Sequence, residues 1–81
     1  MSTLAIKFDE HAVDVNFTHD ALHVVLADGR EISAPLEWFP RLRDANEASR
    51  KNWRLIGQGI GIHWPEVDED IAISTLMRGH D

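Results

Sequence analysis

Residues 13–34 read VDVNFTHDALHVVLADGREISA, and this stretch decides the fold. Apolar side chains recur at every second position in two runs, which are Val13, Val15, Phe17 and then Leu22, Val24, Leu26. That period is typical of strands with one buried face. Asp28-Gly29 then predicts a tight hairpin, because glycine tolerates the positive φ of a type I′ turn. With a third strand over residues 30–34 and Ile32 facing inward, the first half is predicted to be a three-stranded antiparallel meander.

The segment after the meander is expected to form short helical pieces. Pro35 ends strand pairing, because proline lacks the N–H that a ladder requires. Pro40 interrupts an apolar cluster, so two short helical turns are expected to meet there. Asn46 is predicted to cap a further helix that runs to about Trp53. The side of this helix that is expected to face inward carries Ala45, Ala48, Asn52 and Leu55.

Three glycines alternate with other residues near the start of the last third of the chain. Gly57, Gly59 and Gly61 match neither of the glycine-rich loops that bind phosphate. Their spacing predicts an extended segment up to Pro65, with a bend or a close approach of another backbone.

The C-terminal residues complete the predicted fold. Residues 66–70 are expected to form an acidic loop, and Ser74 to cap a last short helix through Met77, before Gly79. The predicted class is α+β: a small antiparallel sheet, made of the N-terminal meander plus a later strand, with two or three short helices. At 81 residues the chain has room for one domain, residues 1–81.

Composition excludes several classes of protein. The chain has no Cys, which excludes disulfides, thiolate zinc sites and a Cys nucleophile. No apolar run approaches the roughly 20 residues that a membrane-spanning helix needs. Lys7 and Asp9 interrupt the N-terminal apolar residues, so we expect no signal peptide and a cytoplasmic protein.

The net charge of −6 is unevenly distributed. Residues 30–55 carry a net +2, whereas residues 1–29 and 56–81 carry −4 each. The basic segment either is compensated within the chain or faces an anionic partner. Because domains that bind nucleic acid are usually basic overall, the net charge disfavours nucleic acid as the main ligand.

The three Trp residues have two interpretations, which the sequence leaves open. They form the core, since large aromatics bury much of the area that a small domain needs. Alternatively they belong to a partly exposed surface rich in Trp and Arg, the residue types that most often dominate interfaces. The candidate partner-binding residues are Trp38, Phe39, Arg41, Arg50, Asn52, Trp53 and Trp64. The acidic loop residues Asp68, Glu69 and Asp70 are expected to contact Arg41 or Arg50.

Five motifs in order carry a resemblance to a known family. They are Gly29-Arg30, Pro35-Leu36-x-Trp38-x-Pro40-Arg41-Leu42, Arg50-x-Asn52-Trp53, Gly59-x-Gly61-Ile62-His63-Trp64-Pro65 and Asp68-Glu69-Asp70-Ile71. The chain resembles the bacterial DUF2442 family of domains of unknown function, in its stand-alone short form. The resemblance implies a small α+β domain with an antiparallel sheet and brings no established activity. A toxin–antitoxin role has been suggested for gene pairs that include such domains.

We expect no catalytic residues and no cofactor, because no catalytic or nucleotide-binding motif is present. The leading hypothesis is a non-enzymatic, small acidic protein that binds or regulates another protein, such as an antitoxin-like partner of a neighbouring gene product. One alternative is a nucleic-acid-associated accessory to a transcriptional regulator, using residues 41–54. Another is a metal protein centred on His63, Glu66, Asp68 and Asp70. A homodimer is a secondary expectation, since sheet edges must be covered.

Overall fold

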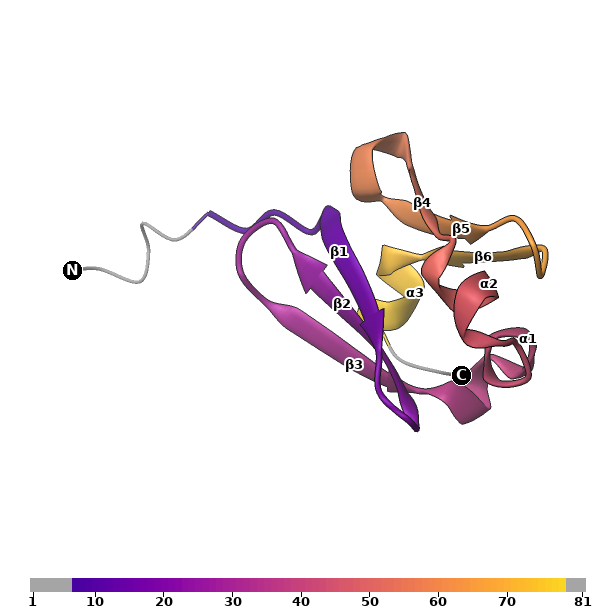
Figure 1. The fold of residues 1–81 in the computed structure, drawn as a ribbon. Helices are drawn as coiled ribbons and strands as arrows, with labels where there is room; N and C mark the ends of the chain where they lie inside the picture. Colours follow the sequence, from indigo (N-terminus) through magenta and orange to yellow (C-terminus); the bar gives the residue numbers. More distant parts are fainter. Residues whose placement is uncertain (1–6, 79–81) are drawn as a thin grey trace.

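The computed structural model describes residues 7–78 and contains two antiparallel sheets of three strands each (Figure 1). The strands of the first sheet are β1 (Ala12–Phe17), β2 (Ala21–Leu26) and β3 (Glu31–Pro35). Those of the second sheet are β4 (Arg54–Ile56), β5 (Gly61–Trp64) and β6 (Glu69–Ala72). The α+β class and the N-terminal meander are therefore confirmed, and the later strand lies in a second sheet with two strands that were not predicted.

Short helices join and cover the two sheets. They are the 3-10 turns η2 (Leu36–Trp38) and η3 (Gly57–Gly59) and the α-helices α1 (Pro40–Arg43), α2 (Glu47–Lys51) and α3 (Ile73–Arg78). Two helical turns thus meet at Pro40, as predicted. Among residues 7–78, no helix is long and apolar enough to cross a membrane.

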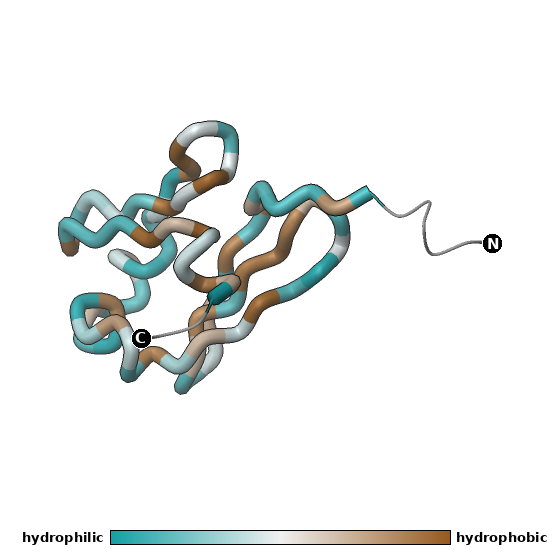
Figure 2. The backbone as a smooth tube through the Cα atoms, turned by 180° about the vertical axis from the view of Figure 1, so that it is seen from behind, coloured by the Kyte–Doolittle hydropathy of each residue, from teal (hydrophilic) through white to brown (hydrophobic). Residues whose placement is uncertain are grey.

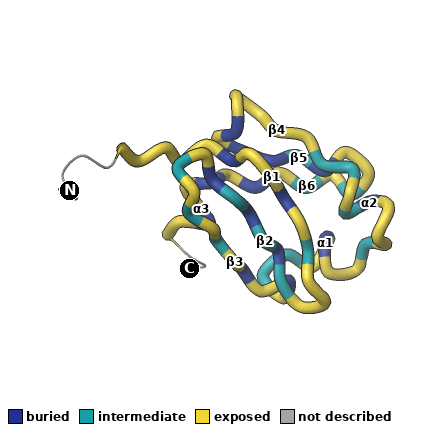
Figure 3. Tube along the Cα trace, turned by 60° about the vertical axis from the view of Figure 1, so that its left-hand side comes forward, coloured by how far each residue is buried: buried dark blue, intermediate teal, exposed yellow. Residues whose placement is uncertain are grey.

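The core lies between the two sheets, and β2 contributes three of its most buried side chains. Leu22, Val24 and Leu26 are at most 1% exposed and alternate with half-buried residues, as Figure 3 shows along β2. Figure 2 shows hydrophobic residues along β2 and hydrophilic residues in the turn between β2 and β3. The remaining core side chains are Ala12, Val15, Ala34, Leu36, Leu42, Ile62, Trp64, Ile71, Ile73 and Leu76.

Val13 does not face the core as the alternation predicted. The pairing of β1 with β2 shifts between Ala12, which pairs with Leu26, and Asp14, which pairs with Val25. Val13 is the extra residue of this β-bulge and is 53% exposed, while Ala12 takes the buried position. A bulge reverses the alternation locally, so a strict period of two assigned Val13 to the wrong face.

The turn between β2 and β3 also differs from the predicted type I′ turn. That type needs positive φ at two positions, and here only Gly29 has it, at 94°. The Gly29 N–H donates to the Leu26 carbonyl (3.0 Å), and Leu26 N–H donates to the Arg30 carbonyl (2.8 Å). Gly29 therefore has the left-handed conformation of a bulge residue that follows a tight turn. This arrangement is typical of a three-residue hairpin loop.

Asp28 holds this turn through its carboxylate, which is 5% exposed. The carboxylate accepts hydrogen bonds from Arg30 Nε (2.9 Å), from the Arg30 main-chain N–H (3.0 Å) and from the Asp9 N–H (2.9 Å). These donors stabilise the ionised form, the Arg30 side chain most of all, and hold the pKa of Asp28 well below its usual value.

This lowered pKa predicts a specific acid sensitivity. Because the unfolded chain binds a proton at Asp28 near pH 4 while the folded chain stays ionised, the stabilisation is complete above about pH 5 and is lost on acidification. We expect wild type to melt at a higher temperature than Asp28→Asn at pH 6, and the difference to shrink towards pH 3. Thermal unfolding followed by circular dichroism measures this gap. A gap of constant size over that range contradicts the role of Asp28.

The cap of α2 is confirmed, but its inward face is not the predicted one. Asn46 Oδ1 accepts a hydrogen bond from the Ser49 N–H (2.8 Å), and the helix ends at Lys51, two residues before Trp53. Ser49 is buried, whereas Ala48 and Leu55 are exposed; Ala45 and Asn52, the other two residues of the predicted face, are half-buried. The shorter helix turns Ser49 and Arg50 inward, because both find polar partners there.

The glycine-rich segment is extended only in its second half, where Gly61–Trp64 form β5 before Pro65 as predicted, and its first half is a turn. Gly57, Gln58 and Gly59 all have positive φ (57°, 63° and 108°) and connect β4 to β5. The predicted close approach of another backbone is confirmed at Gly59. A Cβ on this residue would lie 2.5 Å from the carbonyl oxygen of Ala12 at the start of β1.

The predicted acidic loop is shorter than residues 66–70. Glu69 and Asp70 belong to β6, which pairs with β5 through Trp64–Glu69 and His63–Asp70. Only Ile71 of this strand is buried. The adjacent acidic residues therefore gave the segment the sequence pattern of an exposed loop. Ser74 lies inside α3, which begins at Ile73, and so does not cap it; Gly79 lies outside the described residues.

Candidate functional site

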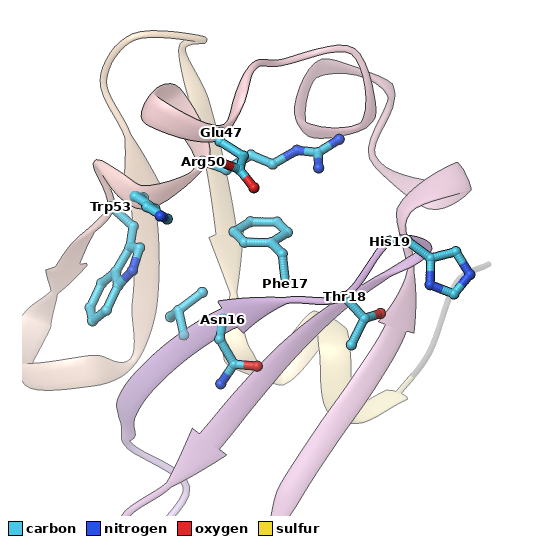
Figure 4. A pocket seen from close by; sticks show the side chains of 9 residues that line it. Asn16, Phe17, Thr18, His19, Glu47, Arg50 and Trp53 are labelled. Carbon is cyan, nitrogen blue, oxygen red and sulfur yellow. The ribbon is translucent and has the colours of Figure 1, made fainter.

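A groove of about 500 Å³ lies between the end of β1 and helix α2 (Figure 4). Its lining residues come from β1 and the turn that follows, and from α2 and the residues after it. They are Val15, Asn16, Phe17, Thr18, His19, Glu47, Arg50, Lys51 and Trp53. A volume of this size is within the range of sites that bind small molecules or peptide side chains.

Phe17 and Trp53 give the groove its aromatic surface. The Phe17 ring points towards α2, while Asn16 and Thr18 point to the opposite side of the strand (Figure 4). Phe17 contacts the buried Trp64 edge to face, with ring centroids 6.2 Å apart. Both Phe17 and Trp53 are half-buried and pack on the core, so they present fixed rings to the groove.

Arg50 is a structural cation that also borders the groove. Its Nε donates to the Leu42 carbonyl (2.8 Å) and its Nη2 to the Arg43 carbonyl (2.6 Å), which are main-chain carbonyls at the end of α1. The guanidinium lies 5.6 Å from the Phe17 ring centroid, within the range of a cation–π contact. Two of its five N–H donors are thus used on main-chain carbonyls.

Lys51 is an exposed positive charge of the groove. It is exposed, and within residues 7–78 it forms no hydrogen bond or ion pair. Glu47, one helical turn earlier and also exposed, forms no ion pair with described residues either. The groove therefore carries a net charge of +1 on a chain of net charge −6, counting Arg50, Lys51 and Glu47.

The structure divides the candidate residues that the sequence grouped together. Arg50 and Trp53 line the groove. Trp64 is fully buried and donates its indole N–H to the Arg50 carbonyl (3.0 Å), so it belongs to the core. Trp38 and Phe39 contact each other edge to face at 6.5 Å and pack on the core from η2, outside the groove lining.

Arg41 and Asn52 hold the loop between β5 and β6. Arg41 Nη1 donates to the main-chain carbonyl of Asp68 (2.6 Å), so the expected contact exists but uses the backbone and not a carboxylate. Asn52 Nδ2 donates to Glu66 Oε1 (2.9 Å), and the Ser49 hydroxyl donates to Glu66 Oε2 (3.0 Å). These bonds fasten α2 to the second sheet and thereby fix one side of the groove.

The residues proposed for a metal site are not brought together. His63 bonds to Asp70 across β5 and β6, while Glu66 bonds to Ser49 and Asn52. In residues 7–78, no group of three His, Asp or Glu side chains has an arrangement that could hold a metal ion.

Part of the basic middle segment is compensated within the chain. Arg43 pairs with Asp44 (3.0 Å) and with Glu37 (3.1 Å), and these bonds, with Asp44 first, raise the pKa of the Arg43 guanidinium. Arg41 and Arg50 donate to main-chain carbonyls, as described above. These arginines therefore have fewer donors left for phosphate groups than their number in the sequence suggests.

The fold and this groove define a small α+β domain with a candidate binding surface. The chain matches the family model described as "Protein of unknown function (DUF2442)" over residues 12–81, which is nearly its whole length. The protein belongs to the DUF2442 family, as the motifs indicated. No curated protein and no solved structure matches the chain significantly.

Half of the groove was missed at the level of the sequence. Its β1 side, from Val15 to His19, was interpreted only as sheet and turn. The alternation correctly indicated that Phe17 faces inward, but it could not indicate that this end of β1 lies opposite α2. That relation depends on packing between residues 30 or more positions apart.

Proposed function

We propose that the protein is a non-enzymatic protein-binding module and that the groove between β1 and α2 is its binding site. The observation that carries this proposal is the combination of two fixed aromatic rings, Phe17 and Trp53, with the exposed cation Lys51 beside them. Aromatic residues held in place by packing supply most of the energy of many interfaces, and an accessible charge selects the partner. A concave site with few polar groups is the usual form of a binding site.

The charges of the groove favour an acidic partner protein over nucleic acid. Arg41, Arg43 and Arg50 donate to acceptors within the chain, which leaves few cations for the several phosphate contacts that nucleic-acid binding requires. A regulatory, antitoxin-like role towards a neighbouring gene product is one form of this proposal. The homodimer stays a separate prediction, which light scattering in the micromolar range tests.

The proposal predicts that capture of a partner depends on the groove. We expect the tagged wild-type chain, expressed in its native host together with the neighbouring gene product, to recover a partner at a stoichiometric ratio. Lys51→Glu should reduce the recovered amount about tenfold, because charge reversal opposes an acidic partner. Quantitative mass spectrometry of the purified complex measures the ratio.

The matched control is Arg78→Glu, which makes the same change of charge on α3, outside the groove. It should recover as much partner as the wild type. Recovery of no stoichiometric partner by the wild type, or equal recovery by all three proteins, contradicts the proposed function.

A further inference from the structure

We infer that the partner binds as an extended, acidic segment that adds a strand to the open edge of β1; this inference rests on the proposed function. β1 is an edge strand of the first sheet, whose order is β1-β2-β3. Extended segments commonly bind at such edges, where main-chain hydrogen bonds supply affinity and alternate side chains supply specificity.

The hydrogen-bond pattern identifies which main-chain groups of β1 are not used in pairing with β2. The Thr18 N–H donates to the Ala21 carbonyl (2.9 Å), so Thr18 occupies a hydrogen-bonded position opposite β2. Hydrogen-bonded and non-hydrogen-bonded positions alternate along an antiparallel pair, so Asn16, like Thr18, bonds to β2. The main-chain N–H and C=O groups of Val15 and Phe17 therefore point away from β2. No hydrogen bond from another element reaches these groups within the part of the chain that the structure describes.

The length of the open edge is limited at its other end. Gly59 packs against Ala12, and the bulge at Val13 twists the start of β1 away from a regular ladder. The open groups of Val15 and Phe17 are about 7 Å apart along the strand, so a segment of about three residues covers the edge. The groove beside it provides space for the side chains of that segment.

The side chains around the edge determine the composition of this segment. Residues of an added strand alternate between the two faces of the sheet. On the Phe17 side they meet Phe17, Trp53 and Lys51, which favours apolar and acidic residues together. On the other side they lie over a polar row formed by Asn16, His23 and Ser33, which favours small polar residues. One acidic residue fits better than two, because Glu47 would repel a second one near the start of α2.

A synthetic peptide tests the inference directly. The probe is acetyl-Ser-Val-Ser-Glu-Ser-Val-Ser-amide, which presents Val, Glu and Val on one face in either strand direction. We expect it to bind the full chain and to slow hydrogen exchange of the Val15 and Phe17 amides, measured by NMR. The Asn16 and Thr18 amides are already bonded within the sheet and should change little.

Two matched sets of controls isolate the charge and the main-chain bonds. The same peptide with Lys in place of Glu should bind wild type at least tenfold more weakly, and Lys51→Glu should reverse this preference while Arg78→Glu preserves it. N-methylation of one alternate set of peptide amides should abolish binding, and methylation of the other set should not, since only one set faces β1.

Distinct results overturn the inference and the proposed function. The inference fails if the peptide does not bind at about 1 mM, if it binds without protecting the Val15 and Phe17 amides, or if Lys51→Glu leaves its preference unchanged. If capture from the host still depends on Lys51 in those cases, the groove binds a protein by another mode. If the peptide behaves as expected but capture from the host does not depend on Lys51, the proposed function fails.

Discussion

We expect Gly59→Ala to lower the free energy of unfolding by about 3 kcal/mol or more, one of the two largest effects predicted for a single substitution in this chain. Two independent costs add. At φ +108° an alanine is strained, which costs about 1–3 kcal/mol. In addition, its Cβ would lie 2.5 Å from the carbonyl oxygen and 2.8 Å from the nitrogen of Ala12, so β1 must move away from η3.

Gly29→Ala is the matched control for this substitution. Gly29 has a similar φ of +94°, but a Cβ there meets nothing within 4 Å. It should therefore cost only the strain, about 1–2 kcal/mol. Urea denaturation of both variants measures the difference. Equal losses of stability contradict the conclusion that the close approach of Ala12 to Gly59 adds to the cost of the strained backbone.

The second large effect is expected for Trp64→Ala, at about 3–5 kcal/mol. Trp64 is 0% exposed, contacts Phe17 edge to face and donates its N–H to the Arg50 carbonyl. Its removal leaves a cavity and an unpaired carbonyl at once. For a chain of 81 residues the free energy of unfolding is roughly 4–12 kcal/mol. If the wild-type value lies in the lower part of that range, the variant should be largely or wholly unfolded at 37 °C.

Trp64→Phe separates the ring from its hydrogen bond. Phenylalanine keeps most of the apolar volume but loses the donor to Arg50, which should cost about 1–3 kcal/mol. The order of stability is thus expected to be wild type, then Trp64→Phe, then Trp64→Ala, measured by urea denaturation. A loss below about 1 kcal/mol for Trp64→Ala means that Trp64 is not the centre of the core.

The parts of the fold that were predictable from sequence are those with a local signal. The alternation around Leu22 and Val24 predicted the meander, Pro40 predicted the break between two helical turns, and Asn46 predicted the cap of α2. In each case the cause is a residue type whose geometry acts within a few positions.

The second sheet was not predictable because its outer strands carry little local signal. All three residues of β4 are exposed, and β6 buries only Ile71. Pairing with β5 forms these strands, and that pairing depends on the turn at Gly57–Gly59, where three successive positive φ values take the place of the first half of the expected extended segment. The groove was not predictable for a related reason, since no local pattern in the sequence indicates that Phe17 and Trp53 line the same groove.

The order of strands within each sheet has a consequence for how the chain acquires its structure. In both sheets every strand pairs only with its neighbour in sequence, without a crossover. Each hairpin closes over a short loop, which keeps the entropy lost on closure small. The rate of folding rises as contacts become more local, so this chain should fold faster than β-sandwiches of similar length. The last step of folding is then the packing of the two three-stranded sheets against each other, because neither sheet can bury its apolar face without the other.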